Sequence, residues 1–367
     1  MKFAKTAVAL AAVTTLALAG CSTSTPAQTT PPTTQAPATS APAATTQAPT
    51  TAAPQTTAPA AAGLTITMLP KNLGNPYFDQ STAGSKEAAA EIGATVTEVG
   101  PATGSPDGQV SYVETATQQK VSAIIFSAND PNAMCDSLKA AVAAGIKVVT
   151  FDSDTGGCPE ARQLFVNQVS VDGVAQTLVE MIADQTGDSG DIAWLSATAQ
   201  ATNQNAWIEA TNAILAKDHP NIKVVETAYG DDDDQKSFDQ TKALLAKYPN
   251  LKLIVAPTTV GIVAAARYIS TSDRNGKVLV TGLGTPTSMK PYITSGTTKE
   301  FALWNPQDLG YLATYAVQAL VNGDITGKEG DTFKAGRLGD YKVGANGEVP
   351  LGPAYKFNKD NIGNFNW

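Results

Sequence analysis

Short apolar runs rich in β-branched residues alternate along most of the chain with longer stretches rich in alanine, leucine and lysine. The short runs predict strands, and the longer amphipathic stretches predict helices. Buried strands that are joined through helices form parallel sheets with both faces covered. The pattern therefore predicts an α/β fold. The expected strands span 65–69, 95–99, 123–127, 147–151, 191–196, 222–227, 252–256 and 277–281, and the expected helices lie within 81–93, 131–145 and 235–249.

The number of expected strands indicates two domains. The segment from Leu64 to Trp367 is longer than a single core of ordinary size holds. At least eight strands fit two doubly wound domains better than one very wide sheet. We therefore expect two parallel sheets, each covered by helices on both faces.

The N-terminal part of the chain follows a different pattern. Residues 1–20 carry Lys2 and Lys5 and then an apolar run of signal-peptide length, which predicts an export signal. The run is too short to span a membrane as a mature helix. Residues 22–62 contain only Thr, Ala, Pro, Gln and Ser. Because such a stretch cannot bury enough apolar surface to offset its ordering entropy, it predicts a disordered tether.

The cysteines have separate expected roles. The export signal ends in LAGC at residues 18–21, which resembles the lipobox of bacterial lipoproteins. The resemblance implies that Cys21 is lipidated and anchors the protein at the outer face of the cell membrane; the alternative is an ordinary secreted protein with a chance cysteine. Cys135 and Cys158 then form a pair in an exported protein, where oxidising conditions favour a disulfide over two separate buried thiols. The single histidine, His219, lies far from both, so no metal site is expected.

Charge and motifs exclude several classes of function. The formal net charge of -8 comes without a basic cluster, which argues against a nucleic-acid partner. GLGTP at residues 282–286 lacks the third glycine of a dinucleotide fingerprint, and the GxSxG elbow of a serine hydrolase is missing, so neither a cofactor nor a catalytic residue is expected. The acidic run at 231–234 lacks the spacing of a calcium loop and predicts a solvated loop.

Polar side chains follow the predicted strands at the positions where this class of fold binds ligands. In open parallel sheets, ligands bind outside the carboxyl ends of the strands. Mixed donors and acceptors match the hydroxyl groups of a polyol, and aromatic rings cover the apolar face of a sugar. The pattern predicts a binding site for a polyhydroxylated ligand. Its members are Lys71; Asn129 and Asp130; Asp152 and Asp154; Asn203, Gln204 and Asn205; and Pro257, Thr258 and Thr259, with Tyr77, Phe78, Trp207 and Trp304 as nearby aromatics.

Several long motifs, in order along the chain, carry a resemblance to a known family. They are PKNLGNPYF (70–78), SAIIFSANDPNAMC (122–135), VVTFDSDT (148–155), TNQNAWIEA (202–210) and FNKDNIGNFNW (357–367). From about Leu64 to Trp367 the chain resembles the type I periplasmic sugar-binding proteins of bacterial ABC importers. Within that group it is similar to the receptors for rhamnose and for autoinducer-2.

The resemblance implies two Rossmann-like doubly wound lobes joined by a three-segment hinge. Residues 64–168 with 306–343 would form the N-terminal lobe, and residues 169–305 with 344–367 the C-terminal lobe. The lobes are expected to close over one small ligand. The loaded protein, expected as a monomer, would then dock on the permease subunits in the membrane.

The resemblance also assigns residues to the ligand site. Lys71 matches the lysine of the family, Asp152 the first aspartate of its DSD segment, and Gln204 its glutamine. Asn203 replaces an aspartate of the autoinducer receptors, which removes a charged acceptor and adds a donor. We therefore expect a neutral monosaccharide such as rhamnose, with autoinducer-2 as the alternative.

The remaining assignments complete the predicted site. Pro257 and Thr259 take the Pro-x-Ala positions of the autoinducer receptors, and Gly74 with Pro76 is expected to form a turn that brings Tyr77 or Phe78 over the ligand. The full set of predicted ligand-binding residues is Lys71, Phe78, Asn129, Asp152, Asp154, Asn203, Gln204, Pro257, Thr259, Trp304 and Asn305.

Several of these residues have a structural alternative. Lys71 could be a solvated strand end, and Phe78 or Trp304 a core residue. Asn129 precedes a proline as a helix N-cap does, and Asp154 could cap a turn. An enzyme is the rival class, but the two aspartates of the DSD segment are too near in sequence to flank a glycosidic bond.

Overall fold

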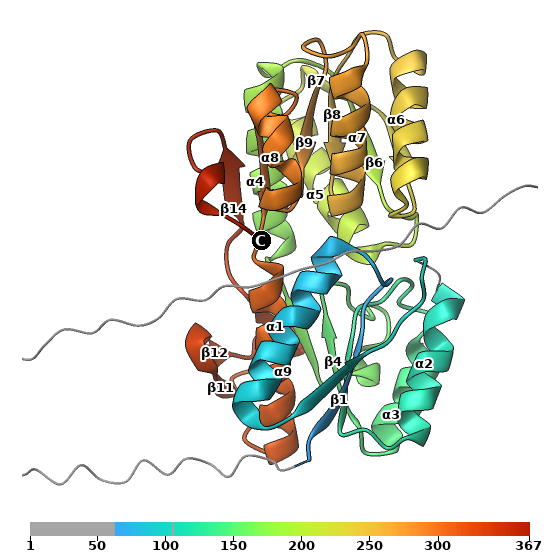
Figure 1. Ribbon diagram of the computed structural model, residues 1–367, viewed down its shortest axis with the longest axis vertical. Helices are drawn as coiled ribbons and strands as arrows, with labels where there is room; N and C mark the ends of the chain where they lie inside the picture. The colour runs from blue at the N-terminus through green and yellow to red at the C-terminus, as the bar shows by residue number, and fades with distance from the viewer. Residues whose placement is uncertain (1–62, 105) are drawn as a thin grey trace, which may run out of the picture. The chain divides into compact units, whose positions relative to one another are not determined.

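The computed structural model describes residues 63–104 and 106–367. Within them the chain forms two larger parallel sheets, which are the cores of two lobes, and two small antiparallel pairs (Figure 1). The predicted export signal, Cys21 and the tether at 22–62 lie outside the described residues. Among the described residues, no helix has the length and apolar character that crossing a membrane requires.

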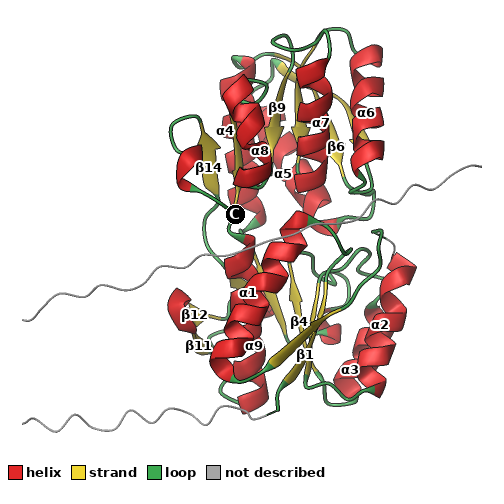
Figure 2. Ribbon diagram, in the orientation of Figure 1, coloured by secondary structure: helices red, strands yellow, loops and turns green. Residues whose placement is uncertain are grey.

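The N-terminal lobe is built on a six-stranded sheet of order β13-β5-β4-β3-β1-β2, in which every neighbouring pair is parallel. The central strands are mostly apolar and almost fully buried, as is typical of strands with helices on both faces. Helices α1 and α9 pack together on one face, and α2 and α3 on the other (Figure 2). The elements are β1 (Thr65–Leu69), β2 (Thr95–Glu98), β3 (Ala123–Phe126), β4 (Lys147–Phe151), β5 (Leu164–Asn167), β13 (Glu348–Pro350), α1 (Pro76–Ile92), α2 (Pro106–Gln118), α3 (Cys135–Ala143) and α9 (Pro306–Asn322).

The C-terminal lobe is built on a four-stranded parallel sheet of order β7-β6-β8-β9. Helices α4 and α5 pack together, as do α6, α7 and α8, so this sheet is also covered on two sides. The elements are β6 (Gly190–Ser196), β7 (Ile222–Tyr229), β8 (Leu251–Ala256), β9 (Leu279–Gly282), α4 (Val171–Thr186), α5 (Thr202–Asp218), α6 (Asp234–Lys247), α7 (Thr259–Thr271) and α8 (Pro286–Ser295). The predicted fold class is confirmed, and each predicted strand is present.

The chain crosses between the lobes three times. The crossing segments are 168–170 between β5 and α4, 304–305 between β10 (Glu300–Leu303) and α9, and 351–354 between β13 and β14 (Tyr355–Asn358). β14 pairs antiparallel with β10 beside the second lobe. β13, in contrast, pairs with β5 in the six-stranded sheet, whereas the family resemblance assigns the whole of 344–367 to the second lobe. A further pair, β11 (Thr332–Ala335) with β12 (Gly339–Lys342), is antiparallel.

Helices α1 and α9 approach so closely that each requires a glycine. A Cβ atom added at Gly84 would lie 1.8 Å from the carbonyl oxygen of Gln307, and one added at Gly310 would lie 1.8 Å from that of Ser81. Real Cβ contacts are never so short, because atoms at that distance overlap. The helix that returns from the second lobe is therefore fixed directly on the first helix of the N-terminal lobe.

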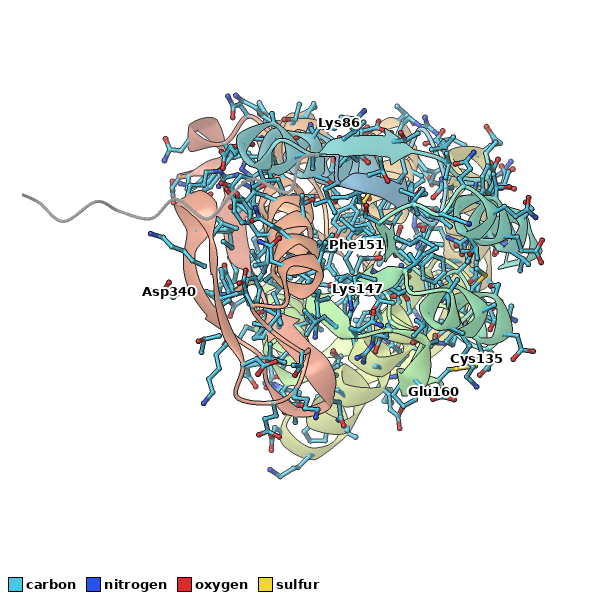
Figure 3. All side chains as sticks on the ribbon, turned by 90° about the horizontal axis from the view of Figure 1, so that it is seen from below. Lys86, Cys135, Lys147, Phe151, Glu160 and Asp340 are labelled. Atoms are coloured by element: carbon cyan, nitrogen blue, oxygen red, sulfur yellow. A yellow bond between two sulfur atoms is a disulfide. The ribbon has the colours of Figure 1, made fainter. Side chains whose placement is uncertain are left out.

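A disulfide joins Cys135, at the start of α3, to Cys158 in the loop after β4. Figure 3 shows the sulfur atoms near the label of Glu160, whose carboxylate pairs with Lys139 at 2.6 Å. The hydroxyl of Thr155 donates to the carbonyl of Cys158 at 3.2 Å. The bond thus restrains the loop at 152–158, which begins with a candidate ligand residue.

Candidate ligand-binding site

A cavity lies at the carboxyl ends of the strands of both sheets, where this class of fold binds its ligands. Both lobes contribute to its walls, since the lining residues follow β1, β4, β7, β8, β9 and β10 or begin α1 and α5. The cavity is lined by Lys71, Asn75, Tyr77, Phe78, Asp152, Asn203, Gln204, Trp207, Asp232, Pro257, Thr258, Thr259, Leu283, Leu303 and Trp304.

The wall from the N-terminal lobe contains an ion pair. Lys71 follows β1 and Asp152 follows β4, and the distance from Lys71 Nζ to Asp152 Oδ2 is 3.6 Å. Ser127, which follows β3, donates from Oγ to the same carboxylate oxygen at 2.9 Å. Both charged side chains are 7% exposed, so the pair is largely shielded from water. Burial strengthens the attraction between the charges, and Lys71 is therefore not a solvated strand end.

Asn203, in the first turn of α5, bridges the two lobes. Its Oδ1 accepts from Lys71 Nζ at 3.3 Å, and its Nδ2 donates to the main-chain oxygen of Asp152 at 3.3 Å and to its Oδ1 at 3.4 Å. An amide can accept from the ammonium group and donate to the carboxylate at once, which an aspartate at this position could not do. Ser153 and Thr202 add a second direct contact between the lobes, with 3.1 Å between their hydroxyl oxygens.

Gln204 is the neighbouring amide and is oriented by its own lobe. Its Oε1 accepts from Ser196 Oγ at 2.7 Å and from the main-chain N–H of Ala197 at 2.9 Å. These bonds occupy the oxygen, so Nε2 is the group that can donate to a ligand. Gln204 is 5% exposed, so the fold and not the solvent fixes the orientation of its side chain.

Aromatic rings form the apolar part of the cavity. Trp304 donates from Nε1 to the hydroxyl of Tyr77 at 2.8 Å, and the two rings meet edge to face. Trp207 contacts Trp304 with ring centroids 5.7 Å apart, and Phe78 contacts Tyr77 at 5.1 Å. Burial and the nearby Asp152 carboxylate raise the pKa of Tyr77 well above its usual range, so it stays a neutral hydroxyl. Phe78 and Trp304 therefore each belong both to the hydrophobic core and to the cavity wall.

A second carboxylate, Asp232, lines the cavity from the loop between β7 and α6. Thr258, which follows β8, donates a hydrogen bond from its hydroxyl to Asp232 Oδ1. Burial raises the pKa of Asp232, and Asp152 acts in the same direction, while the Thr258 bond and Lys71 lower it. The expectation of a solvated loop therefore fails at Asp232, which is half-buried and lines the cavity. It describes its neighbours Asp231 and Asp233, which are exposed.

Three predicted ligand residues do not line the cavity. Asp154 points the other way and makes a two-bond ion pair with Arg162, at 2.6 Å for each bond. Asn305 caps α9, since its Oδ1 accepts from the N–H of Gln307 at 2.9 Å. Asn129 donates from Nδ2 to the main-chain oxygen of Lys71 at 2.7 Å and so supports the loop from behind.

The sequence missed Asn75, Asp232, Leu283 and Leu303 among the lining residues. Asn75 caps α1, because its Oδ1 accepts from the N–H of Tyr77 at 3.1 Å, and Pro76 opens the helix. The expected turn at Gly74 and Pro76 leads directly into α1. Tyr77 and Phe78 lie at the N-terminal end of this helix. The N-P pair was a usable signal for this cap.

Comparison with known proteins gives the same architecture. The sequence profile of the periplasmic binding protein domain matches residues 66–325. A sugar ABC transporter protein from Actinomyces odontolyticus is 47% identical, with a TM-score of 0.67 over 83% of this chain and 97% of that chain. An ABC transporter solute-binding protein from Clostridium phytofermentas with bound L-rhamnose is 38% identical, with a TM-score of 0.80 over 83% of this chain and 98% of that chain. LsrB from Clostridium saccharobutylicum in complex with AI-2 is 26% identical, with a TM-score of 0.78 over 83% of this chain and all (100%) of that chain.

Proposed function

Because the chain belongs to the family of periplasmic binding protein domains, we propose that it captures a neutral monosaccharide, rhamnose or a close relative, by closing its two lobes. At the coarser level the chain is a sugar-binding component of an ABC importer, and it is a binding protein rather than an enzyme. The observation that carries the finer proposal is the shared cavity, where Lys71, Asp152 and Asn203 meet across the lobes.

The chemistry of the cavity supports a neutral polyol. Its charged groups are one ammonium, Lys71, and two carboxylates, Asp152 and Asp232. Hydroxyl groups can donate to the carboxylates and accept from Lys71 and from Gln204, so a sugar satisfies both kinds of partner. The rings of Phe78 and the tryptophans offer flat apolar surface to the C–H face of the same sugar.

The amide at position 203 supports rhamnose over autoinducer-2. An aspartate there, as in the autoinducer receptors that the motif resembles, would bring a further carboxylate next to Asp152 and could not donate to it. The structural likeness to LsrB and the presence of Pro257 and Thr259 in the cavity keep autoinducer-2 as the second candidate. We expect Asn203→Asp to lower the affinity for rhamnose and to raise the ratio of autoinducer-2 to rhamnose affinity.

The cellular setting is part of the proposal. Lipidation of Cys21 and the tether at 22–62 would hold the receptor at the outer face of the membrane, next to its permease subunits. The receptor is proposed to act as a monomer. Replacing Cys21 by Ser should release the exported protein into the surrounding medium, and a protein that stays in the membrane fraction would contradict the anchor.

A ligand panel tests the binding proposal. Purified protein is mixed with L-rhamnose, D-ribose, D-galactose, D-xylose or autoinducer-2, and its thermal midpoint is recorded. A ligand that binds only the folded state raises the midpoint, by an amount that grows with its concentration over Kd. Calorimetry on the best ligand should then give one site per chain.

Two results would contradict the proposal. One is a midpoint that none of the sugars raises. The other is conversion of a sugar into a product, followed by chromatography of the mixture, since a receptor returns its ligand unchanged.

A further inference from the structure

Asp232 is the one lining carboxylate of the described residues whose charge is not balanced by a close ion pair. Asp152 has Lys71 at 3.6 Å, whereas the hydrogen-bond partner of Asp232 is the neutral hydroxyl of Thr258. The field of Lys71 reaches Asp232, but so does that of Asp152, with the opposite sign. With one ammonium and two carboxylates ionised, the cavity carries a formal charge of one negative unit.

The backbone positions Asp232 in an unusual way. Asp231 and Asp232 both adopt left-handed conformations, with φ of 55° and 51°. Few residues other than glycine do so, and consecutive instances are rarer still. Asp152, the other cavity carboxylate, has φ of 60°. Strained backbone conformations of this kind cluster at functional sites, where the required position of one side chain outweighs the local conformational cost.

The strained turn places adjacent aspartates in different surroundings. Asp231 is exposed and pairs with Lys236, and Asp233 caps α6 by accepting from the N–H of Lys236 at 2.7 Å. Asp232, between them, faces the cavity and is held there by Thr258. A single hydrogen bond to a carboxylate leaves most of its acceptor capacity for a ligand, since the two oxygens together offer about four lone pairs.

We propose that Asp232 is the residue that makes the cavity select neutral sugars and reject anionic ones. The inference rests on the proposed function and adds a specificity-determining residue to it. A hydroxyl group of a neutral sugar donates to Asp232. A carboxylate or phosphate group at the same place meets a like charge in a partly shielded site, where repulsion is stronger than in water. Acids and phosphates of the same sugars are therefore excluded.

Matched pairs of ligands and matched variants test this proposal. The neutral probes are L-rhamnose, D-galactose and D-ribose, and the anionic probes are D-galacturonate and D-ribose 5-phosphate, which are counterparts of two of them. Affinities are measured by calorimetry at constant pH and ionic strength. Asp232→Asn keeps the shape and removes the charge, and Asp232→Ala is a second variant. Asp231→Asn is the control, because it removes the same charge from the next residue outside the cavity.

We expect the ratio of neutral to anionic affinity to change in the Asp232 variants and to stay nearly constant in the Asp231 variant. Asp232→Asn should weaken neutral sugars by about fivefold, because a charge-assisted bond becomes a neutral one. It should strengthen the anionic counterpart by about tenfold or more, because the repulsion is gone. Asp231→Asn should leave the ratio of neutral to anionic affinity within about twofold, since an exposed charge is screened. Circular dichroism and thermal unfolding check that each variant is folded.

Three outcomes would overturn the inference. If Asp232→Asn and Asp232→Ala leave the ratio as it is in the wild type, Asp232 does not select. If Asp231→Asn changes the ratio equally, the selection belongs to the general field of the loop. If the wild-type protein binds none of the neutral sugars, the proposed function itself fails and the inference falls with it. The first two results leave the proposed function intact.

Discussion

The two walls of the cavity are built on different electrostatic principles. The wall from the N-terminal lobe holds Lys71 and Asp152 as a pair, supported by Ser127 and bridged by Asn203. The wall from the C-terminal lobe holds Asp232, whose hydrogen-bond partner among the described residues is the hydroxyl of Thr258. A balanced pair is tolerated in a shielded place, whereas a lone carboxylate there costs stability. In the proposed function, the first wall serves closure of the lobes, and the second serves discrimination between ligands.

The largest expected effect comes from loosening the first wall at its disulfide. In the chain-entropy account, a crosslink over a sequence separation of 23 residues stabilises the fold by about 3 kcal/mol. Replacing Cys135 and Cys158 together by Ser should lower the free energy of unfolding by that amount. Urea titration measures it, with the reduced wild type as a control. A loss below about 1 kcal/mol would show that the loop at 152–158 is held by its other contacts.

Substitutions at the two aspartates of the DSD segment should separate an effect on sugar affinity from an effect on the free energy of unfolding. Asp152→Ala should weaken sugar binding by roughly 2 kcal/mol or more, because Lys71 then faces the ligand without its partner. Asp154→Ala removes the partner of Arg162, whose side chain is 6% exposed, and should lower the free energy of unfolding by about 2 kcal/mol. The affinity of the Asp154 variant for the sugar should stay within about twofold of the wild type.

Calorimetry and urea titration on both proteins decide this prediction. An Asp152 variant with unchanged affinity would remove Asp152 from the site. An Asp154 variant that loses binding but keeps its stability would contradict the contrast between the two aspartates.

A smaller effect is expected where the aromatic rings join the crossing segment to the first lobe. Tyr77→Phe leaves the buried N–H of Trp304 without its acceptor, which should cost about 1–2 kcal/mol of stability. Trp304→Phe serves as the matched variant, and the double variant should lose less than the sum of the two. A double-mutant cycle by chemical denaturation measures the coupling. Strictly additive losses would mean that the bond contributes nothing.

The smallest effect concerns the second wall in the ligand-free protein. Burial raises the pKa of Asp232, so the folded chain holds this proton at a pH where the unfolded chain has released it. Stability therefore falls as the pH rises from the unfolded value, about 3.9, through the folded value. Asp232→Asn should have the same midpoint as the wild type near pH 4 and a higher one at pH 7, on the order of 2 °C. Thermal scans of both proteins across this range test the sign, and a variant that is less stable at pH 7 would contradict it.

Much of the fold was predictable because its central strands are long enough to show their composition. β1 and β4 match the predicted ranges, and the strand-end rule then found Lys71 and Asp152. The predictions missed β5, β10, β11, β12, β13 and β14, which have three or four residues each. A strand of that length shows no period, so its composition has to reveal it. β2, β3 and β9 are as short, but they were predicted because β-branched residues make up at least half of each.

The candidate site was less predictable where several aspartates lie close together in the sequence. Nothing in a run of four aspartates shows that Asp232 turns inward while Asp231 and Asp233 face water. Consecutive left-handed residues direct Asp232 toward the cavity, where the hydroxyl of Thr258 holds its carboxylate. The DSD segment poses the same problem, because Asp152 and Asp154 differ only in which neighbour lies within reach.

The return of α9 and β13 to the six-stranded sheet has a consequence for the order of folding. The four-stranded sheet with its helices comes from one continuous stretch, 171–295, which can fold as soon as it has been made. The six-stranded sheet needs residues up to 350 for its last strand, and α1 has no glycine-matched partner until α9 emerges. During synthesis the half of the molecule that is made first is therefore completed last. A chain interrupted between the lobes therefore lacks both the edge strand and the helix partner that complete this half.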